Sequence, residues 1–411
     1  MKLKEILYVL LLAWILTLCI VNGVIPVKTS SIAIKVPQDY PTIQEAINAA
    51  SAGDTITVAP GTYLESVVIN KSVTLIGEDP KTTIIDRGDS VPSHYGYHHD
   101  SVIFIIADDV VISGFTIQYT GSGRGIHPSG APLDIVIRNV TINRNIIKNV
   151  ETGIMLTYAS EIMIINNTII TKNVGIYSDS STGNIVISKN TIENNKNSGI
   201  LSSHTGVLIV GNNTIMNNGK GMFIVGRQGG VGELAFSTYR GYPSYWIRED
   251  GGGWIINTIY GNLIMNNEYG VYLSVAERAN IFYDNNFVKN RKQAYVEDGT
   301  NWWDNGVRGN YWSDYKGEDL NDDGVGDVPH IIDANNKDNY PLMNPTTTIP
   351  PEEQPALPLT LFIGISVVIA VSMVSIYFTK FRKRRYMTTS SKGHLHTSLK
   401  RILNKLCQKK L

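Results

Sequence analysis

Between residues 32 and 296 the chain is a succession of short runs in which Ile and Val alternate with polar residues. The runs 184-NIVIS and 199-GILSS are typical, and Asn or Gly separates neighbouring runs. Alternation over about four residues is the pattern of a half-buried strand. The pattern therefore predicts an all-β body of many short strands. The exception is 41-PTIQEAINAAS-51, whose apolar residues have helical spacing.

The strands belong to a repeat whose segments each begin with Asn. The starts lie at positions 145, 167, 190, 213, 262 and 286, and they are separated by 22, 23, 23, 49 and 24 residues. A nearly constant period in this range is typical of stacked repeats. Strands this short predict a parallel β-helix, in which each coil lays its strands on the coil below at about 4.8 Å. The repetitive region is long enough for about ten coils at that spacing.

Asn and Gly are expected to have separate roles in such a coil. Asn tolerates the left-handed backbone of tight corners, and stacked Asn side chains hydrogen-bond from one coil to the next. The repeated glycines are expected at corners where a Cβ would be unwelcome. These glycines are Gly175, Gly199, Gly221 and Gly270.

Both ends of such a rod expose unpaired strand edges and need caps. The predicted helix closes the first coil with an apolar face of Ile43, Ala46, Ile47 and Ala50. Residues 301–343 are predicted to cap the last coil. The apolar underside of that cap is predicted to consist of Trp302, Trp303, Tyr311 and Trp312.

Two stretches of the chain resemble known families. The stretch 52-AGDTITVAPGTYLESVVINKSVTLIG-77 resembles the opening of pectate-lyase-like proteins, and 309-GNYWSDY through 338-DNYPLM resembles the C-terminal signature of NosD-like proteins. The resemblance covers residues 35–343. It implies that residues 32–343 form an exported, right-handed parallel β-helix of the carbohydrate-binding and sugar-hydrolase superfamily. It also implies a link to copper, because some NosD proteins are connected with copper supply for nitrous oxide reductase.

Both ends of the chain carry targeting signals. Residues 1–23 have two lysines followed by an apolar run, which predicts a secretion signal. Residues 357–378 are apolar and uncharged, and the basic sequence 380-KFRKRR-385 follows them. This predicts a single transmembrane helix with the body outside, extracellular or periplasmic, and the basic tail 379–411 in the cytoplasm. Residues 344–356 predict a Pro/Thr stalk. A buried helix of a soluble protein is the alternative for the second apolar run.

The net charge of zero hides two regions of opposite sign. From residue 380 onward there are 11 Lys and Arg and no acids, whereas residues 26–379 contain 23 Lys and Arg against 35 Asp and Glu. An acidic body argues against nucleic acid as a partner. Cys19 and Cys407 both lie outside the body, so no disulfide holds it together.

The predicted C-terminal cap contains a loop with the spacing of a calcium site. Oxygen side chains stand at loop positions 1, 3, 5 and 9, and Gly324 stands where calcium loops turn sharply. Position 12 is His330 rather than Glu, so the loop is not an EF-hand. The predicted Ca²⁺ ligands are Asp319, Asn321, Asp323 and Asp327. The alternative is a polar turn whose Asp and Asn side chains satisfy the backbone.

The doubled spacing in the repeat conceals an insertion near residues 227–253. Insertions in repeat folds tend to lie on the binding face, although a self-packed loop is the alternative. Aligning the coils on their repeated glycines predicts that polar residues line a groove beside this insertion. The predicted ligand-binding residues are His127, Tyr158, Asp179, His204, Arg227, Arg240, Trp246, Glu249 and Asp250.

A copper site would need imidazole or soft sulfur ligands. The body has no Cys, and its densest cluster of histidines is in 93-SHYGYHHD-100. This segment supplies His94, His98, His99 and Asp100 as candidate ligands for copper or zinc. Histidines exposed in a polar loop are the alternative.

The sequence favours binding of a polysaccharide or another extended surface polymer. Three alternatives stay open: a polysaccharide hydrolase or lyase, a copper-handling accessory protein, and a structural surface protein. A glycosidase needs two carboxylates at a defined separation, and the sequence identifies no such pair. Catalytic residues are therefore not assigned.

Overall fold

The structure is a computed structural model and describes residues 33–87, 100–179, 183–203, 206–225, 233–249, 252–274 and 280–348. The chain divides into two compact units, Met1–Ile349 and Pro350–Leu411, and the second unit lies outside the described residues. The predicted signal peptide, transmembrane helix and tail also lie outside them, as does most of the predicted stalk. Within the described residues, no helix has the length and apolar character needed to cross a bilayer.

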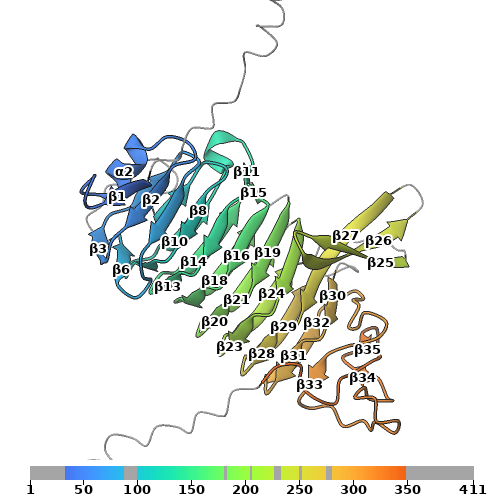
Figure 1. Cartoon of the computed structure of the whole chain (residues 1–411). Coiled ribbons are helices and arrows are strands. Elements are labelled where there is room, and N and C mark those ends of the chain that lie inside the picture. Colours follow the sequence, from blue (N-terminus) through green and yellow to red (C-terminus); the bar gives the residue numbers. More distant parts are fainter. Residues whose placement is uncertain are drawn as a thin grey trace, which may run out of the picture. The chain divides into compact units, whose positions relative to one another are not determined.

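Three parallel sheets, called here A, B and C, wind along the body as a β-helix (Figure 1). Along the chain, successive coils add strands to the sheets in the order A, B, C. The coil strands of sheet A are β1 (Ala33–Val36), β2 (Thr55–Val58), β5 (Thr74–Gly77), β8 (Val111–Ser113), β12 (Thr141–Asn143), β16 (Ile162–Ile165), β19 (Asn184–Ser188), β22 (Val207–Gly211), β27 (Gly252–Tyr260) and β30 (Asn280–Tyr283).

In the described chain sheet B has ten strands and sheet C has nine, in agreement with the predicted number of coils. Sheet B consists of β3 (Gly61–Leu64), β6 (Thr83–Asp86), β9 (Thr116–Gln118), β13 (Ile146–Lys148), β17 (Thr168–Ile170), β20 (Thr191–Glu193), β23 (Thr214–Met216), β28 (Leu263–Met265), β31 (Asn286–Val288) and β33 (Tyr311–Trp312). Sheet C consists of β4 (Val67–Ile69), β7 (Ser101–Ile105), β10 (Arg124–Pro128), β14 (Thr152–Thr157), β18 (Val174–Asp179), β21 (Ser198–Ser203), β24 (Lys220–Val225), β29 (Tyr269–Ser274) and β32 (Lys292–Val296).

Branched apolar side chains fill the interior of the coil. The predicted alternation is confirmed, because every second residue of most strands points inward and stacks on the same position of the next coil. One such column of fully buried residues crosses sheet A as Ile56, Leu75, Ile112, Ile142, Ile164, Ile187, Val210, Ile259 and Phe282. Stacking of like on like buries the apolar face of each coil against its neighbours.

Buried asparagine ladders run along two corners, as predicted. At the corner between sheets A and B, each Asn Nδ2 donates to the Oδ1 of the next coil's Asn at 2.8–3.2 Å. This ladder consists of Asn145, Asn167, Asn190, Asn213, Asn262, Asn285 and Asn310. The last full repeat therefore begins at Asn285, one residue before the predicted start. A second ladder, at the corner between B and C, joins Asn195, Asn218, Asn267 and Asn290.

The repeated glycines stand where neighbouring coils approach closely. A Cβ on Gly175 would lie 2.6 Å from the carbonyl oxygen of Gly199, and a Cβ on Gly221 would lie 2.5 Å from that of Gly270. Their backbones do not need the left-handed region, which is used by other corner residues such as Asn166, with φ 56°. The glycines are therefore required by the space between coils, whereas Asn serves the tight turns.

The predicted helix closes the first coil. The helix α2 (Ile43–Ala49) is shorter than the predicted segment, and Thr42 caps it by accepting a hydrogen bond from the backbone of Glu45. The predicted apolar face is buried: its residues are Ile43, Ala46, Ile47 and Ala50. Short elements beside the coils are η1 (Ala131–Leu133) and the paired strands β11 (Ile137–Arg138) and β15 (Ala159–Ser160).

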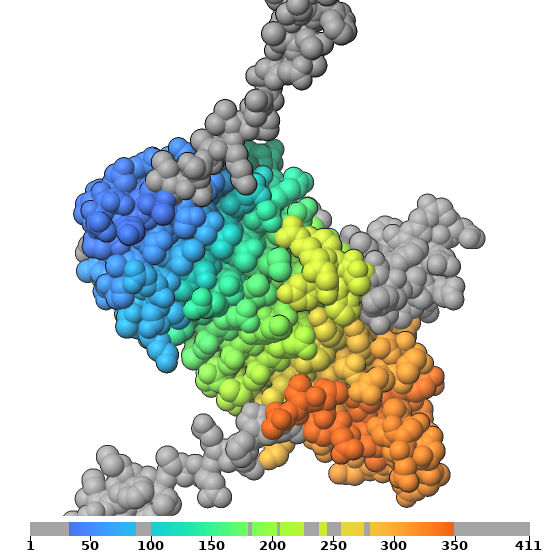
Figure 2. Space-filling view, viewed as in Figure 1, coloured from blue at the N-terminus to red at the C-terminus, as the bar shows by residue number. Residues whose placement is uncertain are grey.

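The insertion forms an antiparallel hairpin on sheet A. Its strands β25 (Glu233–Tyr239) and β26 (Tyr242–Glu249) pair with each other, and β26 pairs with the first half of β27. Tyr239 and Tyr242 at the hairpin tip pack on the outward side chains of Met163, Val186, Val207 and Ile209. Figure 2 shows the yellow hairpin tip lying over the green coils. The hairpin thus covers part of the outer face of sheet A.

Stacked aromatic rings close the C-terminal end. Trp303 stacks on Phe282 with ring centroids 4.5 Å apart, and Trp312 stacks on Phe287 at 4.3 Å. Both tryptophans are buried, which confirms their predicted role, whereas Trp302 and Tyr311 are only partly buried and pack in smaller outer clusters. The cap also contains the paired strands β34 (His330–Ile331) and β35 (Lys337–Asp338).

A buried carboxylate ties the two halves of this cap together. Asp338 accepts hydrogen bonds from Trp312 Nε1 at 2.9 Å and from the backbone amides of Asn310 at 2.7 Å and Tyr340 at 3.0 Å. Burial raises the pKa of Asp338 to about 7, although these donors act in the opposite direction. The group therefore titrates well above the usual range of a carboxyl.

Candidate ligand-binding surface

The outer face of sheet C carries a continuous row of large side chains, called here the sheet C row. Strands β14, β18, β21, β24, β29 and β32 each contribute one residue at the same register. These partly exposed residues are Met155, Tyr177, Leu201, Phe223, Tyr272 and Tyr295. None of the six belongs to a hydrophobic cluster of the described residues. The row is therefore an apolar surface that the described chain does not use for its own core.

The aromatic rings of the row contact one another. The ring centroids of Phe223 and Tyr272 are 5.1 Å apart, and those of Tyr272 and Tyr295 are 4.9 Å apart. Tyr269, at the start of β29, adds a fourth ring 5.4 Å from Tyr272. Aromatic pairs at such distances stabilise each other. The four rings therefore form a platform across three successive coils.

Carboxylates orient two of the tyrosines. Tyr272 donates its hydroxyl hydrogen to Glu297 Oε1 at 2.6 Å, and Ser274 donates to Glu297 Oε2 at 2.6 Å. The hydrogen bond to Glu297 raises the pKa of Tyr272 to about 12, and the bonds from Ser274 and Tyr272 lower the pKa of Glu297. Burial and the neighbouring Asp179 likewise raise the pKa of Tyr177. Both hydroxyls consequently stay protonated near neutral pH.

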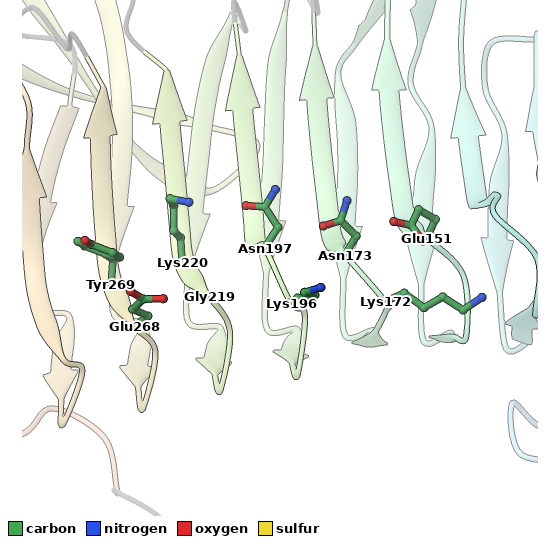
Figure 3. A pocket seen from close by; sticks show the side chains of 9 residues that line it. All are labelled: Glu151, Lys172, Asn173, Lys196, Asn197, Gly219, Lys220, Glu268 and Tyr269. Atoms are coloured by element: carbon green, nitrogen blue, oxygen red, sulfur yellow. The ribbon is translucent and has the colours of Figure 1, made fainter.

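A pocket of about 620 Å³ lies beside the row, at the corner between sheets B and C. Figure 3 shows its side chains on the turns and strand starts of successive coils. The residues lining this corner pocket are Glu151, Lys172, Asn173, Lys196, Asn197, Gly219, Lys220, Glu268 and Tyr269. Lys220 and Tyr269 connect it to the row, because the Lys220 ammonium lies 5.1 Å from the ring centroid of Phe223 and Tyr269 contacts Tyr272. The pocket and the row form one continuous surface.

The structure brings two predicted binding residues to sheet C and a third to its edge. His127 lies opposite Phe104, is only 2% exposed, and has its Nε2 3.3 Å from Thr157 Oγ1. Asp179 follows Tyr177 of the row by two residues and pairs in register with Thr157 and Ser203. Tyr158 is exposed and follows β14 with a left-handed φ of 50°. Asp179 is thus beside the row, whereas His127 is buried.

Arg240 is not brought together with these residues. It forms an ion pair with Glu161 at 3.2 Å and contacts Asn139 Oδ1 at 3.3 Å, so it lies where strands of sheet A begin. His204, Arg227 and Asp250 lie outside the described residues, and so do the side chains of Trp246 and Glu249. The histidine segment with His94, His98 and His99 also lies outside them. Their roles as ligands stay predictions.

The predicted calcium ligands bind the backbone of their own loop. Asp319 accepts from the amides of Asp323 at 3.2 Å and Gly324 at 2.8 Å, and Asp323 accepts from Val325 at 2.8 Å. Asn321 and Asp327 likewise accept loop amides, at 3.1 and 2.6 Å. The part of the chain that the structure describes holds no cluster of three or more metal-ligating side chains. The calcium prediction is therefore not supported, and the alternative of a polar turn explains each of these oxygens.

Sequence reasoning missed the sheet C row although a constant signal was present. Each of its first five residues stands two positions after a repeated glycine. For example, Met155 follows Gly153, Tyr177 follows Gly175, and Tyr272 follows Gly270. The predicted groove used offsets that varied from two to six residues, so it mixed different registers. A single residue of offset reverses the direction of a strand side chain.

Two family models match the chain. The model described as "Right handed beta helix region" matches residues 93–232, and the model described as "Periplasmic copper-binding protein (NosD)" matches residues 255–317. Over these residues the chain is similar to right-handed β-helix proteins and to NosD. The second match covers the end of the coil and the start of the cap, and it overlaps the NosD-like stretch that begins at residue 309 as far as residue 317.

Curated relatives support the NosD-like assignment over a short region. A probable ABC transporter binding protein NosD from Pseudomonas aeruginosa is 34% identical over 105 residues, which are 25% of this chain and 23% of the relative. The protein of the same description from Stutzerimonas stutzeri is 40% identical over 77 residues, or 18% of each chain. The match thus spans about a fifth of the length of these relatives.

Several solved structures have a similar arrangement of coils. They include XylC in complex with xylose (TM-score 0.49, 12% identity, 66% of this chain and 68% of that chain) and pectin methylesterase PemA from Erwinia chrysanthemi (TM-score 0.39, 14% identity, 66% and 93%). A third is the PL6 family alginate lyase AlyGC (TM-score 0.44, 14% identity, 69% and 38%). Similarities at this level carry no argument about the function of this chain.

Proposed function

We propose that this NosD-like protein binds an extended polysaccharide along the outer face of sheet C. The observation that carries the proposal is the sheet C row, whose rings at Phe223, Tyr272 and Tyr295 stand in register on successive coils. Flat aromatic side chains with a polar hydroxyl suit the apolar faces and hydroxyl groups of sugar rings. A ligand that uses the whole row must be long and must run across the strands, parallel to the coil axis.

The orientation of the tyrosines supports the same proposal. Glu297 accepts from Tyr272 and Ser274, so the Tyr272 ring is held in place before a ligand arrives. Preorganised side chains lose little conformational freedom on binding, which favours affinity. Asp179, already a predicted binding residue, lies beside Tyr177 in the same way.

The location of this surface is part of the proposal. The apolar residues 357–378 and the basic residues after them support a membrane anchor with the coil on the outer side, extracellular or periplasmic. The family model that matches residues 255–317 is described as periplasmic, which agrees with an exported coil. A surface polymer is the kind of long ligand that an anchored coil would meet there.

A polymer-binding assay with the full-length protein tests this function. The protein is reconstituted in detergent and applied to an array of polysaccharides, with wild type compared to Tyr272→Ala. We expect binding to at least one polymer, weakened about five- to thirtyfold in the variant, because loss of one aromatic contact removes about 1–2 kcal/mol. The control is Tyr63→Ala, which alters a tyrosine in sheet B.

An unchanged affinity of the Tyr272→Ala protein would remove the row from the binding site. Release of shortened products in the same assay would favour the hydrolase or lyase alternative.

A copper-handling role is the second candidate, and the NosD family match favours it. Among the described residues, His127 packs against Phe104, His330 stacks on Trp312, and no group of three or more His, Cys, Asp or Glu side chains could hold a metal ion. The candidate therefore depends on histidines outside the described residues, His94, His98 and His99 among them. Titration with Cu²⁺ tests it: a His98→Ala/His99→Ala double variant should lose a wild-type binding event, and equal titrations would exclude this segment as the ligand source.

A further inference from the structure

The corner pocket differs in charge from the body around it. Three lysines from successive coils line it, Lys172, Lys196 and Lys220, whereas residues 26–379 as a whole contain 35 acids and 23 basic residues. Lysines this close together in an acidic body produce a local positive field. The pocket is therefore the place on this surface where an anionic group would be attracted.

The acids in the pocket do not cancel this field. Glu268 is already paired with Arg291 at 2.9 Å, and Arg291 lies outside the pocket lining. The other ion pairs within the described residues are Arg240–Glu161 and Arg308–Asp284, so none involves the three lysines. Glu151 remains as the single unpaired acid of the lining, at the end where Lys172 stands.

The side-chain contacts of two of the lysines, Lys172 and Lys220, are with uncharged groups. Lys172 Nζ donates to the backbone carbonyls of Thr120 and Gly121, which are neutral acceptors. The Lys220 ammonium lies 5.1 Å from the ring centroid of Phe223 and 5.5 Å from that of Tyr272. A cation held over aromatic faces is positioned at the boundary between the pocket and the row. It can bind an anionic substituent while the neighbouring rings contact the sugar that carries it.

A glycine of the pocket lining lets two coils approach closely. A Cβ on Gly219 would lie 2.4 Å from the backbone carbonyl oxygen of Lys196 in the preceding coil. The coil spacing of about 4.8 Å is also close to the length of one sugar unit in an extended chain, so consecutive sugars meet consecutive coils.

From these observations we propose that the polymer is an anionic polysaccharide, whose carboxylate or sulfate groups enter the corner pocket and bind Lys196 and Lys220 while its rings lie on the sheet C row. This inference rests on the proposed function and adds the chemical class of the ligand. The surface then has two parts with separate roles: the rings bind any sugar face, and the lysines select for negative charge.

The test compares one polymer in two charge states. Full-length protein is titrated with uronic-acid polymers and with the same polymers after reduction of their carboxylates to alcohols, with a sulfated polymer in parallel. We expect an anionic form to bind about tenfold or more tightly than its neutral counterpart, with an affinity that falls as salt rises because the lysines are exposed to screening. A Lys196→Gln/Lys220→Gln variant should lose this advantage and most of the salt dependence, while its affinity for the neutral polymers stays the same.

A matched variant and four outcomes separate the two proposals. Lys148→Gln changes a lysine of sheet B and should leave all affinities unchanged.

If charged and reduced polymers bind with equal affinity, and Tyr272→Ala weakens both, the anionic preference is overturned and polysaccharide binding still stands. Binding to none of the neutral or anionic polymers would overturn both. Equally tight binding of single-stranded DNA would show a general affinity for polyanions, and this too would overturn the assignment to a polysaccharide. Loss of neutral binding in the lysine variant would show that the lysines do not act through charge.

Discussion

The outer faces of sheets A and C have the same pattern of apolar residues in the sequence, but in the structure these residues are buried on sheet A and partly exposed on sheet C. On sheet A, Val186 and Ile209 point outward but are fully buried, because Tyr239 and Tyr242 of the hairpin pack on them. On sheet C, Leu201 and Phe223 occupy a similar row and stay partly exposed. Outward apolar residues of this β-helix therefore have two different roles. Some are covered by an insertion of the same chain, and others stay partly exposed as a surface that a ligand can contact.

The largest expected effect comes from placing the same charge on both faces. Val186→Lys should lower the free energy of unfolding by at least about 3 kcal/mol, because it buries an unpaired ammonium under the hairpin. Leu201→Lys should change it by less than about 1 kcal/mol, because the exposed side chain can reach water. Denaturant unfolding of the two variants measures the difference. Similar losses of stability would mean that the two faces are equally covered.

Removing the two hairpin tyrosines that cover sheet A should lower the free energy of unfolding and leave the affinity for a polymer ligand unchanged. A Tyr239→Ser/Tyr242→Ser variant should lose about 2–4 kcal/mol of stability, since two large side chains leave the cluster around Val186. Its affinity for a polymer ligand should match wild type at a temperature where both are folded. This expectation differs from that of a groove beside the insertion, in which the hairpin would contact the ligand. A loss of polymer binding with unchanged stability would instead support the predicted binding groove beside the insertion.

The buried carboxyl group of Asp338 should make the stability of the folded protein depend on pH. Asp338 has a folded-state pKa of about 7, above the value of about 3.9 in an unfolded chain. The folded protein therefore binds the proton more tightly, and its stability should fall as pH rises from about 4 to about 7. Asp338→Asn should flatten this part of the profile, as measured by thermal unfolding at several pH values. An opposite slope that depends on Asp338 would mean that its hydrogen-bond donors outweigh its burial.

The smallest effect is expected in the exposed loop of the cap. Asp323→Ala should cost about 1 kcal/mol, because the Val325 amide loses its acceptor. Calcium should leave the melting temperature of both wild type and variant unchanged, as expected for a polar turn. Asp322→Asn is the control, since it changes an exposed neighbour in the same loop. A rise in melting temperature with calcium that disappears in Asp323→Ala would establish the metal site instead.

The coil itself could be predicted from the sequence because its determinants are local and periodic. Alternation sets which residues point inward, and a stack of identical coils repeats that choice. The ladder residues such as Asn190 recur at the period of the coil, and the glycines recur where the coils approach closely. The terminal caps were also predictable, because Ile47 of the helix and Trp303 and Trp312 of the cap are apolar residues at the two ends of the repeat.

The binding surface depended on information that is not periodic. Whether Val186 or Leu201 is covered depends on where the hairpin folds back, and the chain from 233 to 249 does not reveal this by itself. Likewise, the oxygens of Asp319 and Asp323 have calcium spacing in sequence, but their backbone partners appear only when the loop is folded. The sequence by itself determined the repeat, the inward columns and the caps, since each follows from residue type at a fixed period. Only the tertiary structure decided which outward face stays open, because covering is a contact between segments that are distant along the chain.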